Sequence, residues 1–393
     1  MRIVVLGAGA IGSAVAYDLC QADDVLRVKV CESRPAVLRR LRDQIDSPKL
    51  RTYQTDARDH PTLEGILAGA DVVVSCVNPE LNPALAALAL KAGAHFVDLG
   101  GNEATVQQTM ELADEAEQRS RWVVPNCGLA PGLVNVLCMR GIDAFDEVHA
   151  AHLRVGDVPE EPEPPFGYRL SYAAEKLIED YTAPVTVLRD GALETVDPLT
   201  GVEHIEFDEG FGPMEAFHAS GLVSTLPQDL KGRVQELECK ALRYPGHAAG
   251  MRFVLGLGFG EPRSIDVRTH LTYRDVLIRQ LRKRFGGPYR DMVLVRARIE
   301  GVKDGRPQTL IYEVVDHFDE ATGFSAMQRC TGFSVSVTAL LAGRKEIPGG
   351  GACPPERIVP KELFFDELAQ RGIHVTERWE DGVEEAMEAG VEA

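Results

Sequence analysis

A glycine-rich turn near the start of the chain constrains the fold more than any other feature. The apolar run Ile3–Leu6 leads into GAGAIG, residues 7–12, and the helical segment Ala14–Gln21 follows. The first glycine permits a tight turn, the second lets the backbone approach a pyrophosphate, and the third lets helix and strand pack closely. The helix N-terminus offers free N–H groups and the positive end of its dipole to the phosphates. The spacing predicts a dinucleotide-binding turn made of Gly7, Gly9, Ala10, Ile11 and Gly12.

An acidic residue ends the second expected strand. Glu32 lies 20 residues after Gly12, where a carboxylate accepts hydrogen bonds from the ribose hydroxyls and repels a 2′-phosphate. We therefore expect NAD as the cofactor, with NADP less favoured. Arg34 leaves the NADP alternative open, because an arginine at this place can hold the 2′-phosphate.

Short apolar runs alternate with one-sided helical segments through the first third of the chain. Strands that are apolar throughout and separated by helices are typical of a parallel sheet covered on both faces, which is the doubly wound α/β pattern. The expected strands are Ile3–Leu6, Val25–Cys31, Leu50–Tyr53, Asp71–Val77, His95–Leu99 and Trp122–Pro125. The expected helices are Ala14–Gln21, Ala36–Gln44, Thr62–Ala68, Pro83–Ala92 and Thr105–Gln118.

The residues that follow the expected parallel strands are candidates for the cofactor groove. In an open parallel sheet, ligands lie outside the carboxyl ends of the strands. Asp56 either reaches the adenine edge or caps the helix that follows it, and the sequence favours neither role. The candidates for this groove are Asp56, Val77, Asn78, Pro79, Gly100 and Asn126.

After about Pro131 the sequence pattern changes to longer runs in which apolar and polar residues alternate. Such alternation suits an antiparallel sheet with one wet face, and helices are expected at Ala173–Asp180 and Arg274–Arg284. We therefore expect a second, α+β domain built on a mostly antiparallel sheet. Its expected strands are Pro184–Leu188, His204–Phe207, Ile265–Leu271, Met292–Ile299 and Thr309–Val315.

The chain of 393 residues is too long for one typical domain. We expect a dinucleotide-binding Rossmann domain over residues 1–128 and an α+β domain for substrate binding and dimerisation over residues 129–330. Residues 331–393 contain a helical stretch that we expect to return to the Rossmann domain, and an acidic tail that begins near Glu377 and frays.

The composition excludes several kinds of partner. A net charge of −18 disfavours nucleic acid and anionic membrane surfaces. No apolar run reaches the roughly 18 residues of a membrane helix, and no signal-peptide pattern precedes the first strand, so we expect a cytoplasmic protein. The eight cysteines form no CxxC pair and no metal-ligand spacing, which favours buried reduced thiols and no metal.

Several irregular motifs carry a resemblance to a known family. They are HFVDLGGN at residues 95–102, NCGLAPGLVN at 126–135, RYPGH at 243–247 and RCTGFSV at 329–335. With the glycine-rich turn, they make the chain resemble the saccharopine dehydrogenase family from its first strand to about Gly343. The segment at residues 163–191 and the sequence ALRYPGH are most similar to the lysine 6-dehydrogenases of that family. No part of the resemblance extends beyond Lys345.

The resemblance implies an activity and an assembly. It implies NAD-dependent oxidation of the ε-amine of L-lysine, which yields ammonia and 2-aminoadipate 6-semialdehyde, an aldehyde that cyclises to piperideine-6-carboxylate. It also implies a homodimer formed through the sheet of the second domain. A small amino-acid substrate is the ligand expected beside the cofactor.

The same motifs supply candidate catalytic residues. Asp98 ends the fifth strand and resembles the family's active-site aspartate, although a turn aspartate before Gly100 is an alternative. His247 follows the turn pair at residues 245–246 and has a pKa naturally near neutral, which suits proton transfer. We expect Asp98 and His247 to face one another across the reacting carbon.

Further residues are candidates for holding the substrate. Arg243 is the best clamp for a carboxylate, because guanidinium binds carboxylate bidentately. Thr331 stands at an expected helix start, where an N-cap role is the simpler account. The candidate substrate-binding residues are Asn102, Tyr168, Tyr172, Arg243 and Thr331.

Two other functions fit the same residues. One is a reductase that condenses an amine with an aldehyde, as saccharopine- and carboxyspermidine-forming enzymes do, and it needs a second carboxylate clamp such as Arg329 or Arg169. The other is a non-catalytic dinucleotide sensor that uses the second domain's sheet as an interaction surface.

Overall fold

The computed structural model describes residues 1–207, 211–267 and 270–382. They form two compact units. The first unit comprises Met1–Arg140 and Gln328–His374, and the second comprises Gly141–Met327 and the chain from Val375 onward. The first boundary lies beyond the expected residue 128, because helix α7 (Leu133–Ile142) follows the last long strand of the first unit and lies mostly within it.

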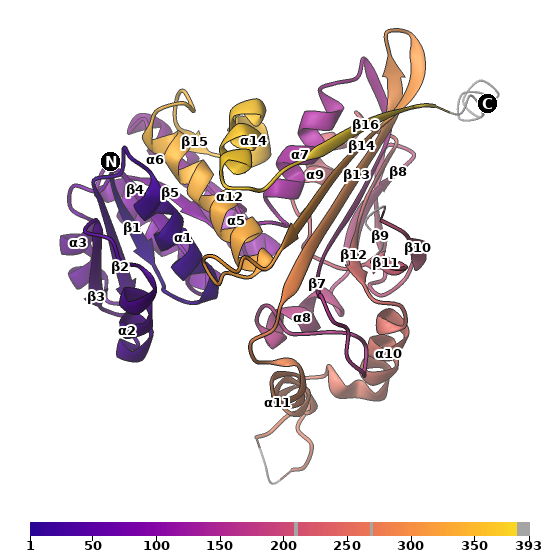
Figure 1. Cartoon of the computed structure of the whole chain (residues 1–393), viewed down its shortest axis with the longest axis horizontal. Coiled ribbons are helices and arrows are strands. Elements are labelled where there is room, and N and C mark those ends of the chain that lie inside the picture. Colours follow the sequence, from indigo (N-terminus) through magenta and orange to yellow (C-terminus); the bar gives the residue numbers. More distant parts are fainter. Residues whose placement is uncertain (208–210, 268–269, 383–393) are drawn as a thin grey trace. The chain divides into compact units, whose positions relative to one another are not determined.

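The first unit is built on a parallel sheet (Figure 1). Its strand order is β15-β6-β5-β4-β1-β2-β3, and every pair is parallel. The order of β1 to β6 is that of a doubly wound dinucleotide fold, so the predicted fold class is confirmed. The strands are β1 (Arg2–Leu6), β2 (Arg27–Glu32), β3 (Leu50–Gln54), β4 (Val72–Ser75), β5 (His95–Asp98), β6 (Trp122–Val124) and β15 (Gly351–Ala352).

Helices cover both faces of this sheet. One face packs its apolar side chains against α3, α4 and α6. On the other face, Gly332 of α12 lies against Ala14 of α1, and Gly343 of α12 lies against Val72 of β4. The helices are α1 (Ala10–Gln21), α2 (Pro35–Gln44), α3 (His60–Leu67), α4 (Asn82–Lys91), α5 (Glu103–Met110), α6 (Ala113–Gln118), α12 (Ala326–Gly343), α13 (Pro355–Ile358) and α14 (Lys361–Gln370).

Two expectations about helices are wrong. The segment Thr105–Gln118 forms two helices, because a break after Met110 lets both Val106 and Ala116 be buried. Helix α12 begins at Ala326 and not near Thr331, because the Asp291 carboxylate accepts hydrogen bonds from the N–H groups of Ala326 (2.7 Å) and Met327 (2.9 Å). Thr331 therefore lies inside the helix and is not its N-cap.

An ionic network ties the chain after Gln328 into the first unit. Arg371 donates to Asp18 of α1 (2.8 Å) and to Glu367 (2.6 Å). Arg344 pairs with the same Glu367 (2.5 Å) and with Asp24 (2.9 Å). Burial raises the pKa of Asp18, and the neighbouring Arg371 opposes this shift.

The second unit is built on a mixed, mostly antiparallel sheet. Its main path is β10-β11-β12-β7-β13-β14-β16, in which β12 and β7 are parallel and the other pairs antiparallel; β8 joins β12, and β9 joins β8. The strands are β7 (Glu147–Pro159), β8 (Val185–Arg189), β9 (Ala192–Val196), β10 (Glu203–Ile205), β11 (Met214–His218), β12 (Glu236–Arg243), β13 (Asp291–Lys303), β14 (Arg306–His317) and β16 (Thr376–Asp381). The helices are α8 (Ala174–Asp180), α9 (Leu226–Leu230), α10 (His247–Val254), the π-turn η2 (Leu255–Phe259) and α11 (Tyr273–Phe285).

Two expectations about the second unit need correction. Within the expected strand Ile265–Leu271, residues 265–267 form a bend and turn, and residues 268 and 269 lie outside the described part. The loop closes on itself through a hydrogen bond from Ile265 N–H to Leu271 O (3.0 Å). The chain near Glu377 does not fray, because Thr376–Asp381 pairs with β14 and Trp379 packs on Phe145; residues 383–393 lie outside the described part.

The eight cysteines are free thiols, buried or half-buried. Across residues 1–207, 211–267 and 270–382, none of the helices is both long enough and apolar enough to traverse a bilayer.

The Arg371 network generates a prediction about stability. Removing one partner of a buried ion pair typically costs about 3 kcal/mol, because the other charge stays buried. We expect Arg371→Met to lower the free energy of unfolding by that amount in urea titrations. The matched control is Arg119→Met, which removes the half-exposed pair with Glu115 and should cost about 0.5 kcal/mol. Equal losses of unfolding free energy in the two variants would contradict the interpretation of Arg371 as the partner in a buried ion pair.

Candidate functional site

The glycine-rich turn of the first unit has little space for side chains at two of its three glycines. Gly7 has a φ of +90°, and a Cβ on it would lie 2.7 Å from the Cys76 carbonyl oxygen. A Cβ on Gly12 would lie 2.1 Å from the Gly7 carbonyl oxygen. The turn after β1 therefore packs closely on its own backbone and on the segment after β4, so neither Gly7 nor Gly12 has room for a side chain.

Gly9 differs from its two neighbours because no atom lies within 4 Å of the Cβ it lacks. It is the N-cap of α1, and no side chain caps the helix there. The first N–H groups of a helix have no partner within the helix, so those of Ala10 and Ile11 remain for an anion. Open space beside uncapped N–H groups fits the pyrophosphate of a dinucleotide.

Glu32, at the end of β2, is buried and strongly hydrogen-bonded. Its carboxylate accepts from Ala8 N–H (3.2 Å), from Arg34 N–H (3.0 Å) and from the Arg34 guanidinium (2.9 and 3.2 Å). Burial alone would raise the pKa of Glu32, but the Arg34 and Ala8 contacts lower it to about 2. The carboxylate is therefore ionised at neutral pH, and the exposed Arg34 is its partner.

Asp56 does not cap the helix that follows it. It is exposed and accepts a hydrogen bond from Arg58 N–H (2.8 Å). The N-cap of α3 is Asp59, whose carboxylate accepts from Thr62 N–H (3.3 Å). The capping role predicted for Asp56 is wrong, and the adenine role stays a prediction.

The loops after β1, β4 and β5 touch one another. The Cβ that Gly7 lacks would lie 3.0 Å from Val77, and that of Gly101 would lie 2.8 Å from Pro79. Asn78 caps the short 3-10 turn Pro79–Leu81 by accepting from Glu80 N–H (3.2 Å). The structure thus brings Val77 and Pro79 together with the glycine-rich turn at the carboxyl edge of the sheet.

The loops after β5 and β6 extend the same edge. Gly100 has a φ of +90°, and its missing Cβ would lie 2.4 Å from Asn126 Oδ1. Asn126 itself has a φ of +65° and is fully buried. The Cβ that Gly128 lacks would lie 3.4 Å from the Thr331 methyl group. Most cofactor candidates of the sequence, and Thr331 of the substrate candidates, therefore lie along one edge.

Asp98, at the end of β5, is buried among donors. Its Oδ1 accepts from Gly100 N–H (2.6 Å) and Asn126 N–H (3.2 Å). Burial raises the pKa of Asp98 to about 6, against the opposing effect of these bonds and of the Asn82 side chain. Asp98 thus holds the loops after β5 and β6 through these hydrogen bonds.

Asn102 caps a helix. Its Oδ1 accepts from Thr105 N–H (2.9 Å) at the start of α5, and the residue is exposed. The oxygen of this amide is engaged within the chain, so only its NH₂ group is left as the predicted substrate contact.

The second unit gathers most of the other candidates around Arg243, at the end of β12. Its guanidinium donates to Leu242 O (2.7 Å) and Asp157 O (3.4 Å), and it pairs with the Asp157 carboxylate (3.5 Å). The Tyr168 ring lies 5.3 Å from the guanidinium carbon, and the Tyr172 phenol is close enough to feel its charge. Asp157, Tyr168, Tyr181, Arg243 and His247 are hereafter called the Arg243 cluster.

His247 is the first residue of α10 and is fully buried. The Glu215 carboxylate holds this helix start by accepting from Gly246 N–H (2.8 Å) and Ala248 N–H (2.6 Å). His247 Nε2 lies 3.1 Å from the Tyr181 hydroxyl, and its ring lies 4.9 Å from that of Tyr168. Burial, aided by the charge of Arg243, lowers the pKa of His247 well below its usual value. This shift opposes the expected titration near neutral pH and favours the neutral ring.

Four polar atoms of the Arg243 cluster are buried without a hydrogen bond. They are Asp157 Oδ2, Tyr168 OH, Arg243 Nε and His247 Nδ1. Buried polar groups normally have partners, so their concentration in one cluster marks a place for a polar ligand. The sequence prediction missed Asp157, which lies outside every motif of the family resemblance, and it did not single out Tyr181 within the segment 163–191.

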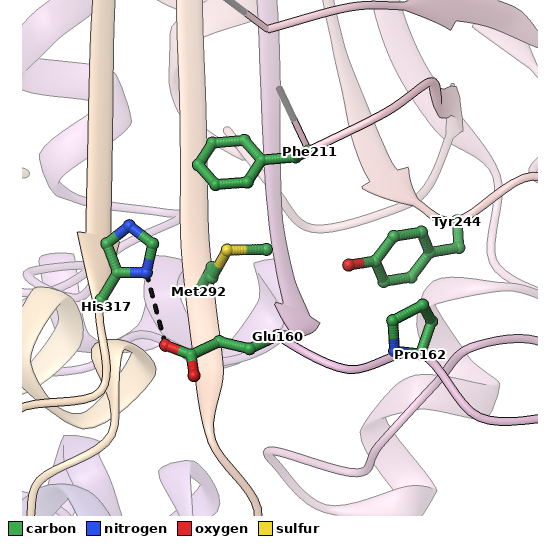
Figure 2. Close-up of a pocket in the computed structure, with 6 residues that line it drawn as sticks. All are labelled: Glu160, Pro162, Phe211, Tyr244, Met292 and His317. Atoms are coloured by element: carbon green, nitrogen blue, oxygen red, sulfur yellow. Dashed lines mark hydrogen bonds and ion pairs between the residues drawn. The ribbon is translucent and has the colours of Figure 1, made fainter. Parts of the chain in front are cut away.

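A separate pocket of about 420 Å³ lies on the second unit (Figure 2). Figure 2 shows His317 and Glu160 facing each other, 3.4 Å apart, beside an apolar floor. None of the candidates from the sequence lines it. The lining residues are Glu160, Pro162, Phe211, Tyr244, Met292 and His317.

Comparison with models of known protein families shows to which family the chain belongs. The model of the saccharopine dehydrogenase NADP binding domain matches residues 3–124, and that of the saccharopine dehydrogenase C-terminal domain matches residues 128–373. The chain belongs to the saccharopine dehydrogenase family. It is therefore an NAD(P)-dependent dehydrogenase, and the turn of residues 7–12 belongs to its dinucleotide-binding domain.

Individual relatives of this saccharopine dehydrogenase family member are distant. It is 23% identical to carboxyaminopropylagmatine dehydrogenase of Synechocystis sp., over 95% of this chain and 96% of that protein. The structure of saccharopine dehydrogenase (L-Glu forming) from Saccharomyces cerevisiae matches with a TM-score of 0.79 and 19% identity, over 96% and 99% of the two chains. Homospermidine synthase from Legionella pneumophila, solved with NAD, gives a TM-score of 0.68 and 14% identity, over 97% and 91%. The two structures show a shared fold.

The two kinds of glycine in the turn generate a prediction. Gly9→Ala should leave the free energy of unfolding within about 0.5 kcal/mol, because its Cβ meets no protein atom, but should weaken NADH binding about tenfold or more. Gly12→Ala should cost about 2 kcal/mol of stability through overpacking. Urea titration and calorimetric NADH binding measure the two effects. Normal NADH binding by Gly9→Ala would show that the pyrophosphate does not bind at this turn.

Proposed function

We propose that this dehydrogenase oxidises the ε-amine of L-lysine with NAD⁺. The products are 2-aminoadipate 6-semialdehyde, which cyclises to piperideine-6-carboxylate, and ammonium. The observation that carries the proposal is the Arg243 cluster, in which a buried guanidinium and a buried carboxylate keep unpaired polar atoms. The ammonium group of an amino acid can donate to the unpaired carboxylate oxygen, and its carboxylate can accept from the unpaired guanidinium nitrogen. The dinucleotide-binding turn provides the place where the oxidant binds.

The reaction balances with these groups. The substrate ammonium first loses a proton, a hydride then leaves the ε-carbon, and water converts the resulting iminium into aldehyde and ammonium. In sum, the substrate ammonium group, NAD⁺ and water give the aldehyde, NADH, ammonium and a proton. Bound NAD⁺ supplies the hydride acceptor. The chain must supply a base for the first step and a clamp for the far end of the substrate.

We assign the base to Asp98. Its pKa of about 6 leaves it ionised at neutral pH yet able to accept a proton. His247 suits the task less well, because burial keeps its ring neutral and opposes protonation. In this proposal His247 is a neutral hydrogen-bonding residue beside the substrate, together with Tyr168. That Asp98 and His247 act on the same carbon stays a prediction.

The alternative is a reductase that joins an amine to an aldehyde. It is favoured by the relatives, which are named for saccharopine, carboxyaminopropylagmatine and homospermidine chemistry. Among these, saccharopine carries carboxylates at both ends and requires a second carboxylate clamp. Arg169 already pairs with Glu163 (3.0 Å), and Arg329 donates to the Arg371 carbonyl (3.2 Å). The engagement of both arginines supports the lysine proposal over the saccharopine form of this alternative.

The direct test is a substrate panel. The protein is mixed with NAD⁺ and with L-lysine, saccharopine, carboxyspermidine or other amino acids, and formation of reduced cofactor is followed. We expect reduction with L-lysine. Reduction only with saccharopine or carboxyspermidine would replace the proposal by the reductase, and no reduction with any substrate would favour the dinucleotide sensor.

The base assignment predicts a pH profile. A carboxyl with a raised pKa is a base only above that pKa, so kcat/KM for lysine should rise as pH increases through about 6. Asp98→Asn should lower turnover by roughly 10²–10⁴-fold and remove that rise, while NADH still binds. The matched control is Asp59→Asn, which alters only the cap of α3. A variant at Asp98 with the same pH profile as the parent would rule Asp98 out as the base.

The choice of NAD over NADP rests on Glu32. Its pKa of about 2 favours an ionised carboxylate, and the end of β2 is the position from which an acidic residue contacts the ribose in dinucleotide folds, so NADH should bind more tightly than NADPH. Glu32→Ala should narrow this gap, because it removes the repulsion and frees Arg34 for a 2′-phosphate. Titrations of both nucleotides measure the ratio. Tighter NADPH binding by the parent protein would mean that Arg34 decides the choice.

The assembly and location stay predictions. A homodimer through the sheet of the second unit and a location in the cytoplasm are proposed from the family resemblance and the composition.

A further inference from the structure

We propose that Asp157 and Arg243 together recognise the zwitterionic head of an α-amino acid. The Asp157 carboxylate binds the α-ammonium group, and the Arg243 guanidinium binds the α-carboxylate. The inference rests on the proposed function for the identity of the site, and it adds Asp157 as the residue that selects α-amino acids over other amines and acids.

The two charges are buried side by side. Asp157 lies in β7 and Arg243 ends β12, and these neighbouring strands run parallel. The Asp157 and Arg243 side chains are 6% and 5% exposed, and their closest charged atoms are 3.5 Å apart. The strand positions fix the pair without a flexible loop, so both charges are presented in a constant arrangement.

Each partner keeps one polar atom for a ligand. Arg243 uses Nη1 on two carbonyls and Nη2 on Asp157, but its Nε has no partner. Asp157 uses Oδ1 on Arg243, but its Oδ2 has no hydrogen bond. The Ser171 hydroxyl is near enough to lower the pKa of Asp157, which burial raises, yet its oxygen completes no hydrogen bond either.

These two atoms define the chemistry of the ligand. The vacant atom of Arg243 is a donor and calls for an acceptor, and the vacant atom of Asp157 is an acceptor and calls for a donor. An α-amino acid carries an ammonium and a carboxylate on one carbon, so its head suits two opposite charges that are themselves in contact. A diamine offers no acceptor to Arg243, and a simple carboxylic acid offers no donor to Asp157.

The aromatic groups around the pair favour an amino acid with an extended side chain. Tyr168, Tyr181 and Phe217 lie in the same buried cluster, with partly buried Phe166 and Tyr172 against it. Burial raises the pKa of Tyr181 to about 12, so its phenol is neutral. The pair therefore lies in an apolar setting, where an unpaired charge is costly and a matched one binds strongly.

Binding of L-norleucine to the NADH complex tests this recognition without any reaction. Norleucine has the head of an α-amino acid but no ε-amine, and hexanoate lacks the ammonium group as well. By calorimetry, norleucine should bind the parent protein at least tenfold more tightly than hexanoate. Asp157→Asn should weaken norleucine binding at least tenfold and change hexanoate binding less than twofold, whereas Arg243→Gln should weaken both.

A control variant and a fold check complete the test. Asp180 is another buried carboxylate of the second unit, already paired with Lys176 (2.9 Å), so Asp180→Asn should leave norleucine binding within twofold. NADH affinity and the melting temperature report whether each variant is folded. An equal loss of norleucine and hexanoate binding in folded Asp157→Asn, or tight norleucine binding by it, would overturn the inference.

The outcome is separable from that of the proposed function. Lysine oxidation by the parent protein with no norleucine selectivity would leave the function standing and remove the role of Asp157. Selective norleucine binding without lysine oxidation would support the amino-acid head site and reject the lysine reaction.

Discussion

The close approach of backbone to backbone at the glycine-rich turn sets the form of the first unit. Gly12 packs on the Gly7 carbonyl, and Gly7 packs on Cys76. These contacts fix the distance between α1 and the sheet. The loops after β4, β5 and β6 then stack along the same edge through Pro79 with Gly101 and Gly100 with Asn126. Gly7, Gly12, Gly100 and Gly101 thus have no room for a side chain, whereas the Cβ that Gly9 lacks would meet no atom within 4 Å.

Sequence patterns predicted the first unit well and the second unit poorly, for a physical reason. The inner strands of the first unit are buried on both faces and therefore mostly apolar, as RIVVL of β1 and VVVS of β4 are. Strands β7 and β12 were missed because they carry charged residues that are buried. Hydrogen bonds from His152 and His218 and the charges of Arg154 and Lys240 hold the pKa of Glu238 far below its usual range, although burial alone would raise it. Such a network resembles a solvated segment when only the sequence is visible.

The sequence likewise predicted some residues of the candidate site and missed others. Motifs led to Arg243, His247 and Tyr168, and the structure places these three together. They did not reveal Asp157, because an aspartate in a long strand carries no signal until its neighbours across the sheet are known. They also suggested a titrating His247, since the usual pKa of histidine is near neutral. Only the burial of the ring and its nearness to Arg243 show that it stays uncharged.

The pairing of Asp18 with Arg371 joins residues 353 positions apart, and it has a consequence for biosynthesis. During translation the ribosome releases all of the second unit except its last strand before it releases Arg371. Before α12 is made, α1 lacks its cover, and before Arg371 is made, the carboxylate of Asp18 lacks its partner. The amino-terminal part of this unit must therefore remain incompletely folded, with apolar surface exposed, until those residues have been made. Vectorial synthesis therefore leaves this nucleotide-binding unit incomplete until nearly the whole chain has been made.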